Sequence, residues 1–594
     1  MTTRRAYDRP WILALLWAVA VLVVAILVRR FWIPLDDGTL AQSAERVLGG
    51  ELPHRDFGDP YTGLNALIGA VAFDLLGISL LSLRIPLVVG FSLWLPAVWL
   101  VARRFADPDV SVVVTALAAL LSVLTYPAAM PTWFGLFTVT WGLVALLAYV
   151  DRASRRWLLA VGAAAGVAVL FKVVGLYFLA AAFVTVAWAR ADGSRHYRTV
   201  TVAGVGLFLL LLGRMVLPRT NETGLVHFFV PGLCLGVALT VQAWRGRPGP
   251  GRGLGPLLSD GAILSVGALA PVLVFLVPYM ASASVGAWTE GVFFLPERRF
   301  GAASSGPAAL WTASTGMAAV ALMVLGTRVT GAMARRGAIA LGALLTAGLA
   351  LDDYLDGAAL TVFWYSARTW IPVLTAVAAW QWLTRRPEPG EGSRESQASV
   401  AVVSTAALWS LVQFPYSSPA YFFYAAPLGV LATMALLHAA GRRRPGPVAG
   451  VLAALYTFLG AGYVAGVAAS STTPLALERG GIRVSEADAE QYARMTEVVR
   501  THGRGGDIWA GPDAPEVYFL SGKPNRTPVI YEFLTPSSPT PEELVRFLDT
   551  RTVVVINSRP LFSAPLSDDV QARLTRAFPE EEAIGPYIVR WRSP

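Results

Sequence analysis

The stretch WILALLWAVAVLVVAILVRRFWIPLDDGTLAQSAERVLGG, residues 11–50, decides the fold class. It opens with an apolar run from Trp11 to about Ile33, and about 20 apolar residues are enough to cross a bilayer. The run has no small-residue cleavage site, so we expect an uncleaved first membrane span rather than a signal peptide. Two adjacent carboxylates, Asp36 and Asp37, follow this span directly.

The whole chain has the composition of a membrane protein. Of its 594 residues, 55% are hydrophobic and 15% are charged, whereas soluble proteins are typically about 25% charged. The mean hydropathy is +0.55, so the apolar side chains cannot all face one interior and most must face lipid. The single cysteine, Cys234, excludes an intramolecular disulfide framework and a thiolate-cluster metal site. We therefore expect an α-helical multi-span membrane protein rather than a soluble enzyme.

Clusters of arginine predict the orientation. They recur between the apolar segments, beginning with Arg4, Arg5 and Arg9, and such clusters collect on the cytoplasmic side of a membrane. The net charge of +9 therefore reports orientation and gives no support for binding nucleic acid. The pattern predicts about 13–15 transmembrane helices within residues 1–469 and a cytoplasmic N-terminus. The short apolar stretch 61–76 is expected at the outer interface, within a first outer loop of residues 34–83.

A small domain is expected after the last span, which ends near residue 469. Strand-like runs at 507–511, 517–520 and 553–557 alternate with helical patterns. These patterns occupy residues 486–501, 541–549 and 568–577. The alternation predicts an α/β domain over residues 470–594, on the outer face.

Asp36 and Asp37 allow two interpretations. A pair of carboxylates beside the lipid boundary is costly to desolvate and needs a reason. One reason is a helix N-cap, in which Asp37 or Thr39 opens the amphipathic helix that follows. However, one cap does not require two carboxylates. The other reason is catalysis, with one carboxylate as a general base and its neighbour as a positioning or metal-binding group.

This loop resembles the first outer loop of a known enzyme family. The shared features are the uncleaved span, the Asp-Asp pair, the helix that ends in Gly49-Gly50, and the run ELPHRDFGDPYTGLN at 51–65. They resemble lipid-phosphate-sugar-dependent glycosyltransferases of the GT-C architecture. The similarity is to the family 39 type, which includes protein O-mannosyltransferases and the aminoarabinose transferase that modifies lipid A. The small-residue run GAAAGVAVLFKVVG at 162–175 continues the resemblance, which covers roughly residues 10–200.

The resemblance implies an inverting transferase in a bacterial plasma membrane. Asp36 would deprotonate a hydroxyl of a glycan, lipid or protein acceptor. That hydroxyl would attack the anomeric carbon of a sugar carried on a polyprenyl phosphate. The transition state would be oxocarbenium-like, and the lipid phosphate would leave with cationic or amide stabilisation. No cofactor is implied as a requirement, although a divalent metal stays possible.

The sequence also departs from the family pattern. The arginine that follows the acidic pair in the lipid A enzyme is missing, and Asp59 replaces the lysine before the loop proline. Contacts to the donor phosphate and sugar must therefore come from other outer residues. The candidates are Arg55, Asp56, Asp59, Arg84, Lys172, Glu290, Arg298 and Arg299.

Each of these candidates also has a plainer interpretation. Lys172 ends an apolar span and could simply extend to the headgroups. The loop 284–306 could be an aromatic belt with charges at its rim rather than a clamp for sugar and phosphate. The tyrosine-rich stretch 413–424 fits either an acceptor groove or an interfacial anchor. For the whole chain, a secondary transporter or a flippase for lipid-linked sugar is the main rival function, and a non-catalytic scaffold is a third.

Overall fold

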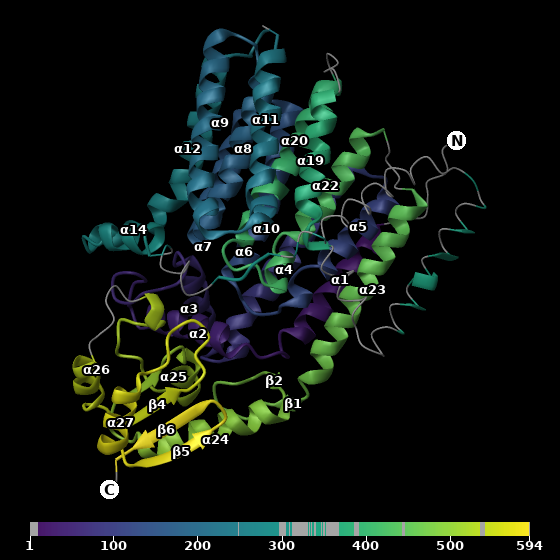
Figure 1. Ribbon diagram of the computed structural model, residues 1–594. Helices are drawn as coiled ribbons and strands as arrows, with labels where there is room; N and C mark the ends of the chain where they lie inside the picture. Colours follow the sequence, from purple (N-terminus) through teal and green to yellow (C-terminus); the bar gives the residue numbers. More distant parts are fainter. Residues whose placement is uncertain are drawn as a thin grey trace.

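The structure is a bundle of long helices followed by a small domain with a mixed β-sheet. The computed structural model describes residues 10–247, 249–295, 367–384, 391–441, 446–534 and 541–592, with short runs and isolated positions between 297 and 351. Figure 1 shows the bundle above and the small domain below, with α2 and α3 between them.

Helices dominate the bundle and the first outer loop. They are α1 (Pro10–Leu27), α2 (Pro34–Leu48), α3 (Leu64–Leu76), α4 (Leu80–Phe105), α5 (Pro108–Leu120), α6 (Pro131–Arg152), α7 (Arg155–Phe171), α8 (Leu176–Arg190), α9 (Arg195–Val216), α10 (Glu222–Gly224), α11 (Val230–Arg245), α12 (Leu254–Phe275), α13 (Val277–Ala281), α14 (Val285–Phe293), α19 (Trp370–Thr384), α20 (Glu391–Trp409), α21 (Pro419–Phe423), α22 (Ala426–Ala439) and α23 (Pro447–Ser470). Within the described residues, eight helical stretches are long and apolar enough to cross a membrane. The chain is a multi-pass membrane protein. Of the expected spans, the one near 308–327 lies almost entirely outside the described residues, and the one near 337–351 is described only in part.

The first helix ends earlier than the sequence predicts. The apolar run was expected to continue to about Ile33, but α1 ends at Leu27. Phe31 has a φ of 68°, a left-handed conformation that cannot continue a helix. One Nη of Arg30 donates to the Ala468 carbonyl of α23, with an N···O distance of 2.7 Å. Residues 28–33 therefore turn the chain from α1 into α2.

The stretch 61–76 forms α3, which is too short to be a span. Its 13 residues extend about 20 Å, against about 30 Å for the hydrocarbon core. The helix packs between α2 and α4: a Cβ at Gly69 would lie 2.7 Å from the Ala44 Cβ and 3.1 Å from the Leu83 Cδ1. The position of this stretch at the outer interface stays a prediction, with which the short length of α3 is compatible.

Small residues bring α7 and α12 into close contact. Gly162 and Gly166 lie one turn apart on α7, against the carbonyl groups of Leu264 and Ala268 in α12. A Cβ at either glycine would overlap one of these oxygen atoms. Such small-residue seams are typical of membrane helices. The seam positions the end of α7, which Lys172 follows directly.

The small domain holds the remaining elements. They are β1 (Thr473–Pro474), β2 (Arg483–Val484), α24 (Glu486–His502), β3 (Ile508–Gly511), α25 (Pro515–Ser521), α26 (Pro541–Leu548), β4 (Val553–Asn557), α27 (Asp568–Ala577), β5 (Glu580–Ile584) and β6 (Tyr587–Trp591). The main sheet has the order β3-β4-β6-β5, in which β3 and β4 are parallel and the other pairs are antiparallel. Ile508 pairs with Val553, and Val553 with Trp591. The sheet thus combines one parallel pair with a hairpin.

Most of the predicted elements of this domain are confirmed. Strands form at 508–511 and 553–557, and α24, α26 and α27 occupy the three helical patterns. The prediction of a strand at 517–520 was wrong, because these residues belong to α25. All residues of α25 are buried and Pro515 opens the helix. A short apolar run that is buried all round has no polar face to distinguish a helix from a strand.

The small domain rests on α2. Gly38 lies against the backbone of Glu516, where a Cβ would have no room. One turn on, the Gln42 Nε2 donates to the Pro515 carbonyl over 3.0 Å. Another turn on, one Nη of Arg46 donates to the Thr527 carbonyl over 2.6 Å. Gly38, Gln42 and Arg46 are four residues apart and therefore lie on one face of α2, and this face contacts the small domain.

Candidate active site

Asp36 lies in the first turn of α2 and is half-buried. Its Oδ2 accepts a hydrogen bond from the Tyr126 hydroxyl, with an O···O distance of 2.5 Å. Tyr126 is itself held in the connection before α6, where the Trp133 Nε1 donates to its carbonyl over 3.0 Å. The Phe31 ring packs edge-on against the Tyr126 ring at 6.0 Å. The carboxylate of Asp36 is therefore oriented while part of its surface remains accessible.

Asp37 has a different environment. Its side chain and that of Arg84 are both fully buried and form an ion pair. The Arg84 Nε donates to the Asp37 Oδ1 over 3.1 Å. The two Nη atoms donate to the Asp37 Oδ2 and to the carbonyl groups of three residues that follow α1, which are Val28, Arg30 and Phe31. These bonds occupy all five N–H groups of the guanidinium. Arg84 was predicted to bind the donor phosphate, but it has no donor left for a ligand.

Asp37 stabilises the start of α2, although it is not the N-cap residue itself. Helix α2 begins at Pro34, so both carboxylates lie in its first turn rather than at the N-cap. The Asp37 Oδ2 accepts the N–H of Ile33, the N-cap residue, over 3.2 Å. Negative charge in a first turn also stabilises the helix dipole. We therefore reassign Asp37 from catalysis to positioning Asp36.

Aromatic side chains from the stretch 413–424 approach Asp36 from the bundle. Tyr421 and Tyr424 pack edge-on at 5.3 Å, and Asp36 interacts electrostatically with Tyr424. Tyr424 is 1% exposed, and its hydroxyl has no hydrogen-bond partner among the described residues. The Lys172 Nζ lies over the Tyr421 ring, 5.4 Å from its centroid. Tertiary packing thus brings Lys172 into the aromatic group beside Asp36.

The small domain adds Tyr531 to this site. The Tyr531 hydroxyl lies 2.7 Å from the Thr39 Oγ1, one turn along α2 from Asp36. Burial raises the pKa of Tyr531 well above its usual value, and the negative charge of Asp36 raises this pKa further. Asp36 is therefore within electrostatic reach of a side chain from the domain that follows α23.

Three of the predicted residues line one cavity of about 250 Å³. Arg55 and Asp56 lie in the first outer loop and Glu290 lies on α14, and all three border this space. The Arg55 Nη donates to the Asp56 Oδ2 over 2.6 Å. The Asp56 Oδ2 also accepts the Leu52 N–H over 2.7 Å, which fixes the turn that carries both residues. Tyr531 borders the same cavity, so the cavity and Asp36 share a neighbour.

Of the other predicted residues in the first loop, Asp59 is not part of the described lining of this cavity. Asp59 is 2% exposed and its Oδ1 accepts the Tyr61 N–H over 2.7 Å, so it stabilises the loop. Its predicted contact with the donor is therefore not supported by its position. Arg298 and Arg299 lie outside the described residues.

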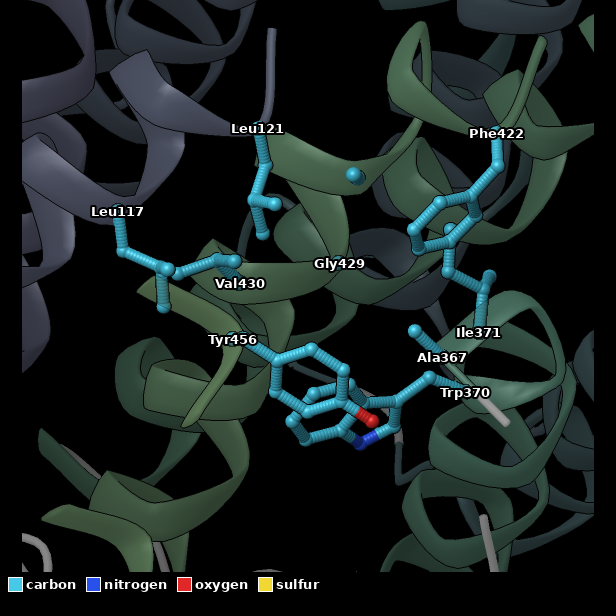
Figure 2. Close-up of a pocket in the computed structure, with 10 residues that line it drawn as sticks. Leu117, Leu121, Ala367, Trp370, Ile371, Phe422, Gly429, Val430 and Tyr456 are labelled. Carbon is cyan, nitrogen blue, oxygen red and sulfur yellow. The ribbon is translucent and has the colours of Figure 1, made fainter. Parts of the chain in front are cut away.

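A second cavity lies among the bundle helices. Figure 2 shows its apolar lining, which includes Leu117, Trp370 and Tyr456. Phe422 lines it from α21, next to Tyr421 of the site. Its volume is about 20 Å³, which is roughly the space for one water molecule. It is too small for a lipid chain in this conformation.

Sequence reasoning missed two residues of the site. Tyr126 and Tyr531 lie 90 and 495 positions beyond Asp36, in segments that no motif marks. The tyrosines of the stretch 413–424, by contrast, stand out in the sequence. Tyr61 lies within the run 51–65 that carries the family resemblance. Within the described residues, no three His, Cys, Asp or Glu side chains converge as a metal site.

The chain is similar to solved structures of two kinds. An apo oligosaccharyltransferase from Archaeoglobus fulgidus is 13% identical with a TM-score of 0.44, and the match covers 93% of this chain and 70% of that chain. ArnT from Cupriavidus metallidurans, bound to undecaprenyl phosphate, is 14% identical with a TM-score of 0.37, and covers 98% of this chain and 99% of that chain. Its apo form has a TM-score of 0.38. No protein-family model and no curated protein matches the sequence.

Proposed function

We propose that this protein is an inverting membrane glycosyltransferase. It moves a monosaccharide from a polyprenyl-phosphate donor to a hydroxyl acceptor on the outer face of a bacterial plasma membrane. The donor class rests on the resemblance of the first outer loop, and the role of each residue rests on the site. The N-terminus is cytoplasmic and residues 470–594 lie outside in this proposal.

One observation carries the proposal: two neighbouring carboxylates have opposite environments. Asp37 is buried against Arg84 and cannot reach a substrate. Asp36 is half-buried and is oriented by the Tyr126 hydroxyl. A general base must be oriented, accessible and within hydrogen-bond reach of the proton that it removes. Of the pair, only Asp36 is both held by a hydrogen bond and partly exposed, which supports its assignment as the base.

The chemistry follows from this arrangement. Asp36 takes the proton of the acceptor hydroxyl as the hydroxyl oxygen bonds to the anomeric carbon. The bond between that carbon and the phosphate oxygen breaks on the opposite face, so the configuration inverts. The departing lipid phosphate carries the negative charge, and the ammonium group of Lys172 stabilises it. In this proposal Lys172 supplies the charge that a divalent metal would otherwise supply.

Replacing Asp36 tests the proposal. The Asp36→Asn variant should accumulate normally and lose transfer from polyprenyl-phosphate-linked radiolabelled mannose or arabinofuranose by about 10²–10⁴-fold, the usual contribution of a general base. Asp74→Asn is the matched control, because Asp74 is an exposed carboxylate on the neighbouring helix α3. Undecaprenyl phosphate should compete with the donor in both proteins. Unchanged transfer by the Asp36 variant would refute the role of Asp36 as the base, whereas absence of transfer by the unmodified protein would favour a transporter or flippase.

A further inference from the structure

The cavity of about 250 Å³ lies between three separate segments. The first outer loop contributes His54 to Gly58, α14 contributes Ala287 to Gly291, and the small domain contributes a wall between Pro528 and Leu534. The walls are joined directly, since the Gly58 N–H donates to the Pro528 carbonyl over 2.8 Å. No segment forms the cavity alone. The small domain therefore completes a space that the membrane part leaves open.

The wall from the small domain is firmly held. Ile530, Tyr531 and Leu534 are buried with Phe57 of the outer loop in one apolar cluster. The guanidinium of Arg46 lies 4.5 Å from the centroid of the Phe57 ring. This packing fixes the cavity wall to α2, the helix that carries Asp36.

The charges of the lining do not suit an anion. Arg55 is the one cation among the described lining residues, and Asp56 already holds it in an ion pair. Glu290 adds a further negative charge. The polar groups are instead suited to neutral hydroxyl groups, because carboxylates accept and guanidinium N–H groups donate. A phosphate group would meet net negative charge here.

His54 adds a fixed, neutral ring to the lining. Its Nε2 lies 2.8 Å from the Tyr61 carbonyl, so this nitrogen carries the proton and donates. Burial lowers the pKa of His54 to about 4, so the ring is neutral at physiological pH. Its Nδ1 is buried against Gly291 of α14, where a Cβ would lie 2.1 Å from it. The ring therefore joins the outer loop to α14 and adds no charge to the cavity.

The cavity has the size and make-up of a small polar-ligand site. Sites for drug-sized ligands are about 300–1,000 Å³ and mostly apolar with a few convergent polar groups. This cavity is slightly smaller and is lined by the same mixture, including the Phe57 and Tyr531 rings. One sugar ring, which has an apolar face and polar edges, fits this description.

We infer that this cavity binds a sugar residue of a carbohydrate acceptor, with the small domain as one of its walls. This inference rests on the proposed function and adds the class of the acceptor. The donor tail lies in the bilayer, whereas the cavity is formed by an outer loop, α14 and the domain. Tyr531 borders the cavity and lies within electrostatic reach of Asp36, so the cavity and the proposed base share a neighbouring side chain. Arg55, Asp56 and Glu290 thus serve the acceptor rather than the donor phosphate.

Filling the cavity tests this inference. Ala287→Trp places an indole in the cavity from α14. Gly286→Trp is the control, because Gly286, the residue before Ala287, is exposed and has open space where a Cβ would lie. Saturation-transfer NMR on the full chain in nanodiscs would use methyl α-mannopyranoside, methyl α-glucopyranoside and methyl α-arabinofuranoside as probes. At least one glycoside should bind, and the Ala287 variant should weaken its binding at least tenfold while the control retains it.

A second variant keeps the test independent of folding. Glu290→Gln changes one exposed side chain and should weaken glycoside binding severalfold, whereas inorganic phosphate should not displace the glycoside. The inference is overturned if no glycoside binds, if both tryptophan variants bind equally, or if phosphate competes. Binding does not require turnover, so glycoside binding without any transfer would refute the proposed function alone. Donor hydrolysis that depends on Asp36, without glycoside binding, would refute the acceptor site alone.

Discussion

Gly38 of α2 lies directly against Glu516 of the small domain: a Cβ at Gly38 would be 2.6 Å from the Glu516 Cα. No side chain fits at this position without separating the two helices. Asp36 and Asp37 occupy the same first turn of α2 as Gly38. The proposed catalytic turn is therefore braced by the backbone of a domain almost 480 residues away.

Gly38→Ala should separate α2 from α25. Overpacking of this kind typically costs about 1–3 kcal/mol, and a shift of Asp36 by about 1 Å would lower transfer by about 100-fold. Thermal unfolding and donor turnover measure the two effects. Gly204→Ala on α9, where the added Cβ meets nothing within 4 Å, should leave both unchanged. Equal behaviour of the two variants would argue against the close contact.

The carboxyl group of Glu516 should make stability depend on pH. Burial raises its pKa from 4.5 to about 7, although the Tyr587 hydroxyl donates to it and opposes this rise. The folded state therefore holds a proton that the unfolded state loses. The contribution of Glu516 to stability is greatest below pH 4.5, falls as the pH rises to about 7, and is then lost, which amounts to about 3 kcal/mol for this group.

Glu516→Gln tests this dependence. Glu532 has a pKa that burial also raises to about 7, so the variant should halve the fall in stability between pH 5 and 7 rather than abolish it. Unfolding temperatures at pH 5, 6, 7 and 8 provide the measurement. A wild-type protein whose stability rises over this range would contradict the assignment.

The ion pair between Asp37 and Arg84 should matter for stability more than for chemistry. Asp37→Asn leaves a fully buried guanidinium without its counterion, which typically costs about 3–5 kcal/mol. Asp36→Asn leaves no buried charge unpaired and should change stability by less than about 1 kcal/mol. The Asp37 variant should therefore have the lower unfolding temperature, and the Asp36 variant should have the larger loss of transfer per folded molecule. If both variants unfolded alike, the distinction between the two carboxylates would fail.

The seam between α7 and α12 should tolerate no added volume. Gly166→Val would force the helices apart at the Ala268 carbonyl and cost about 1–3 kcal/mol. Because Lys172 follows α7 directly, donor affinity should fall as well. Gly206→Val on α9 is the matched control, since its Cβ position is open. Competition by undecaprenyl phosphate and thermal unfolding provide the two measurements.

Local patterns were sufficient for the class of fold. Apolar runs of the required length predicted the membrane helices, and strand-like runs at 507–511 and 553–557 predicted two strands of the small domain. The stretch 517–520 failed because α25 is buried on all sides and shows no polar face. The end of α1 failed because Arg29 and Arg30 were counted within an apolar run, although charged groups leave the bilayer core.

The sequence by itself determined that this chain is a multi-span membrane protein with an acidic pair directly after its first apolar run, since hydrophobicity and charge order are properties of the chain. Only the tertiary structure decided the roles within that pair. Asp36 and Asp37 are adjacent and chemically alike, and they differ because Arg84 neutralises one while Tyr126 orients the other. Arg84 and Tyr126 come from different helical regions, and Tyr531 comes from the small domain. Which groups surround a carboxylate depends on long-range packing, and no local pattern records it.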